Sequence, residues 1–254
     1  MTRAVPLVAV AHGSRDPRAS ATVDALLAEV RRQRPGLSAS AAHLGHSAPS
    51  VGQALDRLAA DGAERAVVLP LLLTAAYHSR IDIPGALSQA RRRHPRLSVR
   101  YGTTLGPHPW FLTALERRLD GMGLRPGDPD TAVVLTAAGS SDARANATVA
   151  GLARAWRRRG WWSVVAAYAS APGPDTGPTP GDAVTSLLGA GAPRVAVAPY
   201  LLAPGLFAAR TAEAGKAAGA AVAPVLGAAP EVVDVVLQRY DEALQATDAV
   251  AEAG

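Results

Sequence analysis

The chain has 254 residues, 48% of them hydrophobic, so it is long enough to bury a full core in one large or two small domains. Its formal net charge of +5 rests on arginine, which suits a ligand with carboxylates or phosphates but is too small an excess to indicate nucleic-acid binding. The absence of cysteine excludes disulfides, thiolate-bound metals and iron–sulfur clusters.

Short β-rich apolar runs alternate with amphipathic stretches of helical length through the first half of the chain. Helical connections between strands imply right-handed βαβ crossovers and therefore a parallel sheet. The predicted strands are Pro6–His12, Ser38–Leu44, Arg65–Leu73 and Leu97–Thr103. The predicted helices that follow them are Arg18–Gln33, Ser50–Ala60, Pro84–Arg93 and Pro109–Asp120.

The order of motifs in the first half returns in the second half. An internal repeat on this scale indicates a duplicated domain. Three segments repeat: "AVAHGSRDPRA" as "LTAAGSSDARA", "RAVVLPLLLTAAYH" as "RVAVAPYLLAPGLF", and "LGPHPWFLTALERRL" as "LGAAPEVVDVVLQRY". The first copies begin at Ala9, Arg65 and Leu105, and the second copies at Leu135, Arg194 and Leu226.

The repeat predicts an α/β fold of two duplicated lobes, each a small parallel sheet flanked by helices. A Pro-, Gly- and Asp-rich break, "GLRPGDPDT", separates the two copies. We therefore predict an N-terminal domain at residues 1–123, a linker at 124–130 and a C-terminal domain at 131–254. The proline-rich stretch Ser170–Gly181 is predicted as a loop inserted after the second strand of the second lobe.

All of the histidines lie in the first half, and all but one of them follow predicted strands. Because the carboxyl ends of parallel strands share one edge, where open α/β sheets bind ligands, we expect these imidazoles around a single cleft. The exception is His94, predicted as a surface residue at a helix end. The others are His12 after the first strand, His43 and His46 after the second, His78 after the third and His108 after the fourth.

The two copies differ at these histidines while they agree at glycines and prolines that shape the backbone. A single histidine at a strand end is most often an ordinary loop residue. Here one copy has the histidines and the other has only the glycines and prolines that shape the same turns. This difference favours chemistry that is carried out once, between two related domains. His12, His78 and His108 align with Ala138, Phe207 and Ala229 in the second copy.

Imidazole is both a proton acceptor near neutral pH and a ligand for Fe(II), Co(II), Ni(II) or Zn(II). Histidines scattered over separate strand ends favour an open, transient metal site over a closed structural zinc site. Competing motifs are absent from the sequence: there is no GxxxxGK[ST] loop, no GxGxxG after a strand and no GxSxG elbow. Phosphate binding by the backbone amides of "AHGSRDP" at a helix start stays open as an alternative.

The "AHGSR" motif at His12 and the H-x-x-x-D-I-P motif from His78 to Pro84 resemble those of the sirohydrochlorin chelatases of the CbiX/SirB class. The resemblance spans both halves of the chain. It implies a class II chelatase-like fold, with a carboxylate-rich sirohydrochlorin-type tetrapyrrole in the cleft between the lobes. It also implies that His12 and His78 face each other across the metal site and act as catalytic residues. The implied reaction inserts Fe²⁺, giving sirohaem, or Co²⁺, giving a cobalamin precursor.

The chain departs from the family pattern after the second strand. "HLGHSAPSV" has Gly45 and Ala48 where relatives carry carboxylates, so we take His46 or His43 as the substitute metal ligand. The tail lacks the histidine-rich region and cysteine-bound cluster of long cobalt-type members, which favours the iron enzyme over the cobaltochelatase. The residues predicted to bind substrate are Ser14, Arg15, Arg80 and His108.

These expectations define the partners of the protein. We expect no permanently bound cofactor, a divalent metal ion as substrate, no nucleic acid and a monomer, since duplication builds both lobes from one chain. The N-terminal apolar run is too short for a signal peptide and no run reaches the ~20 residues of a membrane span, so we expect a cytoplasmic protein. Two further alternatives are a non-catalytic tetrapyrrole- or metal-binding protein and a phosphate-sugar enzyme.

Overall fold

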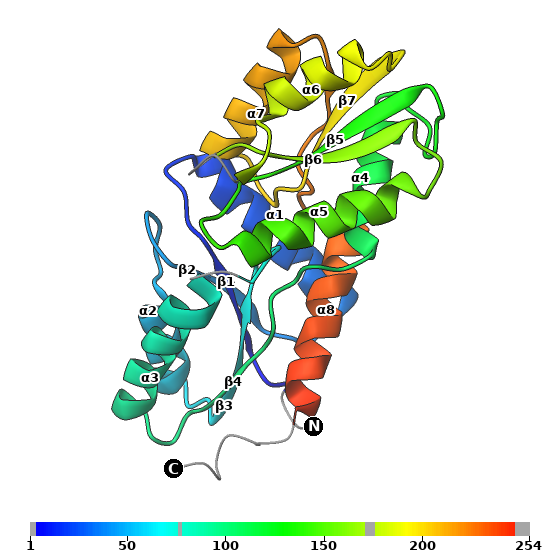
Figure 1. The fold of residues 1–254 in the computed structure, drawn as a ribbon. Helices are drawn as coiled ribbons and strands as arrows, with labels where there is room; N and C mark the ends of the chain where they lie inside the picture. Colours follow the sequence, from blue (N-terminus) through cyan, green and yellow to red (C-terminus); the bar gives the residue numbers. More distant parts are fainter. Residues whose placement is uncertain (1–3, 76–77, 171–175, 247–254) are drawn as a thin grey trace.

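The computed structural model describes residues 4–75, 78–170 and 176–246. They form two four-stranded parallel sheets with the strand orders β2-β1-β3-β4 and β6-β5-β7-β8 (Figure 1), which confirms the predicted duplicated α/β lobes. The strands of the first sheet are β1 (Leu7–Ala11), β2 (Ala39–His43), β3 (Arg65–Pro70) and β4 (Ser98–Tyr101). Those of the second are β5 (Thr131–Ala137), β6 (Ser163–Tyr168), β7 (Arg194–Pro199) and β8 (Ala221–Val222).

The helices begin at local signals in the sequence. Asp16 caps α1 by accepting a hydrogen bond from the Arg18 backbone N–H, and Ser50 and Gln53 form a reciprocal capping box at the start of α2. In the first half the helices are α1 (Pro17–Gln33), α2 (Val51–Ala60), α3 (Ile83–Arg93) and α4 (Trp110–Asp120). In the second half they are α5 (Ala143–Arg157), α6 (Pro180–Gly189), α7 (Leu206–Ala217) and α8 (Pro230–Gln245).

All the predicted strands and helices of the first half are present. The fourth strand is shorter than predicted, ending at Tyr101 rather than Thr103, and two further differences follow β3. The strand ends at Pro70 rather than Leu73, since proline has no N–H to continue the ladder. A π-helical turn, η1 (His78–Asp82), then precedes α3 and was not predicted. In the second lobe β7 ends in the same way at Pro199, so the two copies keep this feature.

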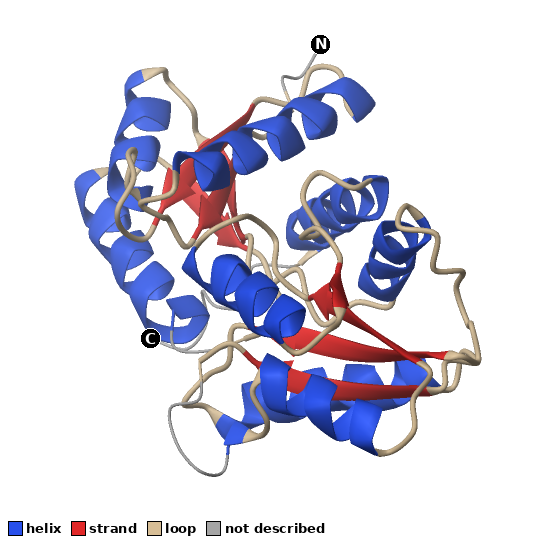
Figure 2. Cartoon of the chain, turned by 90° about the horizontal axis from the view of Figure 1, so that it is seen from above, coloured by secondary structure: helices blue, strands red, loops and turns tan. Residues whose placement is uncertain are grey.

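The central strands of the sheets alternate between two hydrophobic cores, as the period of two requires. In β1, Leu7 and Ala9 belong to a large central core, whereas Val8 and Val10 pack on the outer side of the sheet with residues of α2 and α3. The central core also includes Val133 and other residues of the second lobe. Helices therefore cover both faces of each sheet (Figure 2), and the two lobes share one continuous core.

The last helix of each half packs on the other lobe. Helix α8 contacts α1, β3 and β4 of the first lobe, and α4 contacts β7 of the second, as Figure 1 shows. The Tyr240 hydroxyl on α8 donates to the Val5 carbonyl (2.6 Å), and the Trp156 indole N–H donates to Glu116 on α4 (2.8 Å). The division predicted from the repeat is 1–123, 124–130 and 131–254. In the packing, α4 of the first copy lies on the second lobe and α8 of the second copy lies on the first lobe.

Candidate active site

The turn after β1, which carries His12, lies directly against the turn after β2. Gly13 has a φ of 86°, and a Cβ placed on it would lie 1.7 Å from the Gly45 carbonyl oxygen, so only glycine fits. The Gly45 N–H donates to the His12 carbonyl (3.2 Å), and the Ser47 hydroxyl donates to the Ser14 carbonyl (3.1 Å). The structure therefore brings together the turns that carry His12 and His46.

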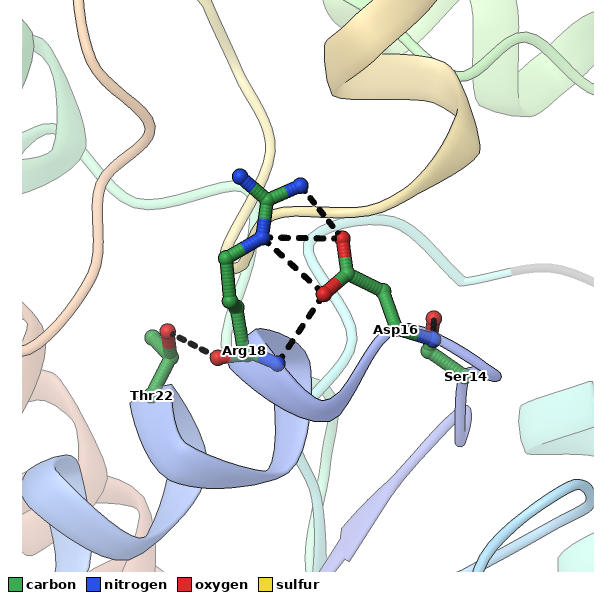
Figure 3. A network of polar contacts seen from close by, with 4 residues as sticks. All are labelled: Ser14, Asp16, Arg18 and Thr22. Carbon is green, nitrogen blue, oxygen red and sulfur yellow. Dashed lines mark hydrogen bonds and ion pairs between the residues drawn. The ribbon is translucent and has the colours of Figure 1, made fainter.

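Ser14 and Asp16 fix the start of α1 through the polar network drawn in Figure 3. The Ser14 hydroxyl accepts a hydrogen bond from the Asp16 N–H (3.1 Å), and Asp16 accepts from the Arg18 backbone (3.0 Å) and its guanidinium (2.7 Å). These hydrogen bonds to Arg18 lower the pKa of the Asp16 carboxyl. Ser14, predicted to bind substrate, thus also holds the turn that carries His12.

The second lobe repeats the capping of this turn after β5, and its capping residue makes an additional contact with the first lobe. Asp142 accepts from the Arg144 N–H (2.9 Å), as Asp16 does from its counterpart Arg18. The other Asp142 oxygen, however, binds the guanidinium of Arg80 from η1 of the first lobe (3.2 Å). Sequence analysis gave Asp142 no role. The sequence signal that could have found it is its alignment with Asp16 in the repeat.

The four segments that follow β1, β3, β5 and β7 meet at the carboxyl ends of the two sheets. Arg80 of η1 reaches the turn after β5, and a Cβ on Gly205, in the loop after β7, would lie 3.5 Å from the Ser14 hydroxyl. Within each lobe the two strands are neighbours, since β1 pairs with β3 and β5 with β7. We call the meeting point of residues 12–16, 78–82, 139–142 and 203–206 the inter-lobe edge.

His43 is the last residue of β2, inside the predicted strand Ser38–Leu44, and therefore does not follow the strand as His46 does. It pairs in register with Ala11 and is 6% exposed. Burial lowers the pKa of its imidazole, with a smaller opposing effect from Asp24 on α1. Its Nδ1 has no hydrogen-bond partner among the described residues. His43 is thus a buried side chain at the end of β2, the strand beside β1, which leads into the turn of His12.

The other predicted residues of the inter-lobe edge are more open. The side chains of His12, His46 and Arg15 are exposed, and His46 adopts a left-handed φ of 61°. His78 begins η1, but its side chain lies outside the described residues. Within the side chains that the structure describes, no three His, Asp or Glu residues are grouped closely enough to hold a metal ion.

His108 is placed against the exchanged helix α8. It is 9% exposed, and burial and the charge of Arg239 lower the pKa of its imidazole, opposed by a hydrogen bond with Gln238 and the charge of Glu242. Its Nδ1 accepts from the Trp110 N–H (3.3 Å). A cavity of about 470 Å³ opens nearby between Trp110 and α8. The binding of substrate by His108 stays a prediction.

His94, expected at the surface, is partly buried. Its Nε2 lies 2.7 Å from Asp56 Oδ1 on α2, so it joins α3 to α2 on the outer side of the first lobe. None of the helices within the described residues is long and apolar enough to cross a bilayer.

Comparisons with known proteins agree with this architecture. The CbiX family model matches residues 6–122 and 132–243. A sirohydrochlorin cobaltochelatase of Priestia megaterium is 30% identical over 207 residues, covering 80% of this chain and 66% of that protein. A sirohydrochlorin ferrochelatase of Bacillus subtilis (strain 168) is 28% identical, covering 57% and 54%. The aligned part therefore spans less than two thirds of the length of these curated relatives.

A solved structure shows the same fold over nearly the whole chain. The structure described as SirB from Bacillus subtilis with Fe³⁺ has a TM-score of 0.77 at 24% identity, over 94% of both chains. A second structure of a Bacillus subtilis sirohydrochlorin chelatase, in complex with cobalt, has a TM-score of 0.75 at 23% identity. At these identities the likeness concerns the fold.

Proposed function

Because the chain belongs to the CbiX family, we propose that it is a sirohydrochlorin chelatase, an enzyme that inserts a divalent metal ion into a carboxylate-rich tetrapyrrole. The observation that carries the proposal is the asymmetry of the inter-lobe edge. The turn of the first lobe that lies against the second lobe has His12, whereas the equivalent turn of the second lobe has Ala138. One imidazole-bearing face serves one ligand.

Metal insertion is a proton-release reaction. The two N–H bonds of the free tetrapyrrole break, the metal ion forms bonds to the nitrogens, and two protons leave. A histidine near neutral pH can accept such a proton and can bind the incoming ion for a short time. We assign these roles to His12 and His78, and metal binding also to His46 and His43. The exposure of His12 and His46 supports this assignment.

The carboxylates of the substrate need cationic partners. Arg15 is exposed beside His12, and Arg80 reaches across to Asp142 with about half of its side chain exposed. Guanidinium groups bind carboxylates with paired hydrogen bonds. We propose that Arg15, Arg80 and the Ser14 hydroxyl bind the rim of the tetrapyrrole, and that a carboxylate of the substrate competes with Asp142 for Arg80.

The metal is proposed to be Fe²⁺ or Co²⁺. The relatives named above include both a ferrochelatase and a cobaltochelatase, so they favour neither metal over the other. Both metals must therefore be compared on the same enzyme.

The test is anaerobic insertion of Fe²⁺ or Co²⁺ into sirohydrochlorin, followed by visible absorbance. We expect the wild type to complete many turnovers. We expect His12→Ala to lower kcat/KM by about 100-fold or more, the usual contribution of a general base. His94→Gln is the matched control, because this histidine pairs with Asp56 on the outer side of the lobe. Its rate should equal that of the wild type.

Two results would contradict the proposal. Binding that saturates at one equivalent per chain without turnover would indicate a tetrapyrrole carrier. Equal rates for the wild type and His12→Ala would remove His12 from the chemistry.

A further inference from the structure

Five large hydrophobic side chains are exposed among the described residues, and the two most exposed are Leu206 (61%) and Ile81 (54%). Single exposed apolar residues are normal on a protein surface and carry no meaning by themselves. The positions of these two are what distinguish them. Ile81 lies in η1, which follows β3, and Leu206 is the first residue of α7, which follows β7.

The two residues occupy corresponding segments of the duplicated fold. Strands β3 and β7 are counterparts in the repeat and both end in proline. Each segment therefore leaves the carboxyl end of its sheet beside the first strand of its lobe. Each copy has one exposed aliphatic side chain in this segment, although the two residues do not align in the repeat.

Both residues are also next to contacts between the lobes. The residue before Ile81 is Arg80, which bonds to Asp142 of the second lobe. The residue before Leu206 is Gly205, which lies against Ser14 of the first lobe. Each exposed side chain thus stands at the inter-lobe edge, one contributed by each lobe, among groups that are otherwise polar or charged.

We propose that Ile81 and Leu206 form the apolar contacts that bind the flat faces of the tetrapyrrole. This inference rests on the proposed function, since it names residues that bind the same substrate. A tetrapyrrole has two apolar faces and a rim of carboxylates, so its receptor needs aliphatic side chains as well as arginines. Contact with the macrocycle removes apolar surface of both residues from water, which favours binding.

The remaining exposed hydrophobic residues do not share this placement. Trp110 lines the cavity beside α8, Met122 follows α4, and Leu188 lies on α6, in the helix layer on the outer side of the second lobe. Leu188, at 40% exposed, is therefore a matched control for loss of an exposed leucine away from the inter-lobe edge.

The experiment measures the Kd of metal-free sirohydrochlorin by absorbance titration, together with kcat and KM for insertion. We expect Ile81→Ser and Leu206→Ser each to raise Kd by about fivefold, and the double variant by about twentyfold, with kcat within about twofold of the wild type. The ratio of variant to wild-type Kd should be the same in low and high salt, because apolar contacts are not screened. Leu188→Ser should bind as the wild type does.

A second pair of variants guards against an indirect effect on folding. Ile81→Met and Leu206→Met keep a flexible apolar side chain and should bind sirohydrochlorin as the wild type does. If the serine variants bind as tightly as Leu188→Ser while the wild type binds and turns over, the inference is wrong and the proposed function stands. If the wild type does not bind sirohydrochlorin, the proposed function itself is wrong. Equal loss in the serine and methionine variants would also overturn the inference.

Discussion

At Gly13 the backbone approaches the neighbouring turn more closely than any other residue type allows. Its φ of 86° is disfavoured for side chains, and a Cβ would lie 1.7 Å from the Gly45 carbonyl oxygen. Gly36, after α1, has a similar φ of 90° but no atom within 4 Å of the corresponding position. Alanine substitutions at these two glycines therefore separate two free-energy costs, that of a left-handed backbone and that of a close contact with the neighbouring turn.

We expect Gly36→Ala to lower the free energy of unfolding by about 1–2 kcal/mol, the cost of a left-handed alanine. Gly13→Ala carries the same backbone cost and must also displace the turn after β2, so its loss should exceed about 3 kcal/mol. Urea unfolding of both variants measures the difference. Equal losses would mean that the two turns separate without cost.

A second prediction at the scale of single residues concerns acid sensitivity. Because burial lowers the pKa of His43 in the folded chain, folding favours its neutral form. Its contribution is therefore fully present above the ordinary histidine pKa of about 6.5 and is lost as the pH falls through the lower folded value. The pKa of His108 is also lowered, mainly by burial, so its contribution to stability is likewise lost as the pH falls.

We expect His43→Gln to reduce the fall in Tm between pH 7.5 and pH 5 and not to abolish it, since His108 remains. His46→Gln is the control, because this exposed imidazole lies in the connection that follows His43 and β2. Thermal unfolding at the two pH values tests the prediction. A fall as steep in His43→Gln as in the wild type would exclude His43 as a source of acid sensitivity.

At the scale of elements, the main feature is the exchange of α4 and α8. Helix α8 contacts α1, β3 and β4 of the first lobe and buries Val232, Val235 and Val236 in the central core, although it belongs to the second copy of the repeat. An ion pair between Arg117 of α4 and Glu231 of α8 joins the two exchanged helices (2.6 Å). Burial opposes ionisation of Glu231, but the Arg117 guanidinium holds the pKa of its carboxyl below the ordinary value.

The exchange predicts where damage to α8 is felt. Val236→Ala should cost about 2 kcal/mol and raise amide hydrogen exchange in β3, β4 and α1, which α8 contacts. Val184→Ala, on α6, removes an equally buried valine from the outer core of the second lobe and should raise exchange in β5 to β7 instead. Identical exchange patterns in the two variants would contradict the assignment of α8 to the first lobe.

At the scale of the whole molecule, the sequence predicts the two parallel sheets. It does not predict that helices α4 and α8 each pack on the other lobe. Alternation such as Leu7–Ala11 and the repeated motifs depend on local pattern, so the strands, their parallel pairing and the duplication follow from it. The repeat says that each copy ends in a helix, but the apolar faces of α4 and α8 suit either sheet. Which lobe each helix covers depends on how the two sheets sit together.

The candidate site divides in the same way. The gathering of His12 and His46 at one edge follows from the parallel direction of the strands, which the sequence patterns indicate. That their strands are neighbours is shown only by the structure. The burial of His43 depends on packing within the first lobe, between residues far apart in the sequence. The reach of Arg80 to Asp142 and the approach of Gly205 to Ser14 depend on contacts between the lobes, which no single segment encodes.

The exchange of helices also limits how the sequence of a duplicated gene can change. Each lobe is a hybrid of both copies, so deleting either copy would strip a helix from the other, and neither can be discarded. Selection could relax on the side chains of the second copy while its strands and last helix were retained. Ala138 and Ala229 stand where the first copy has His12 and His108, so the second copy has the same architecture without these imidazoles.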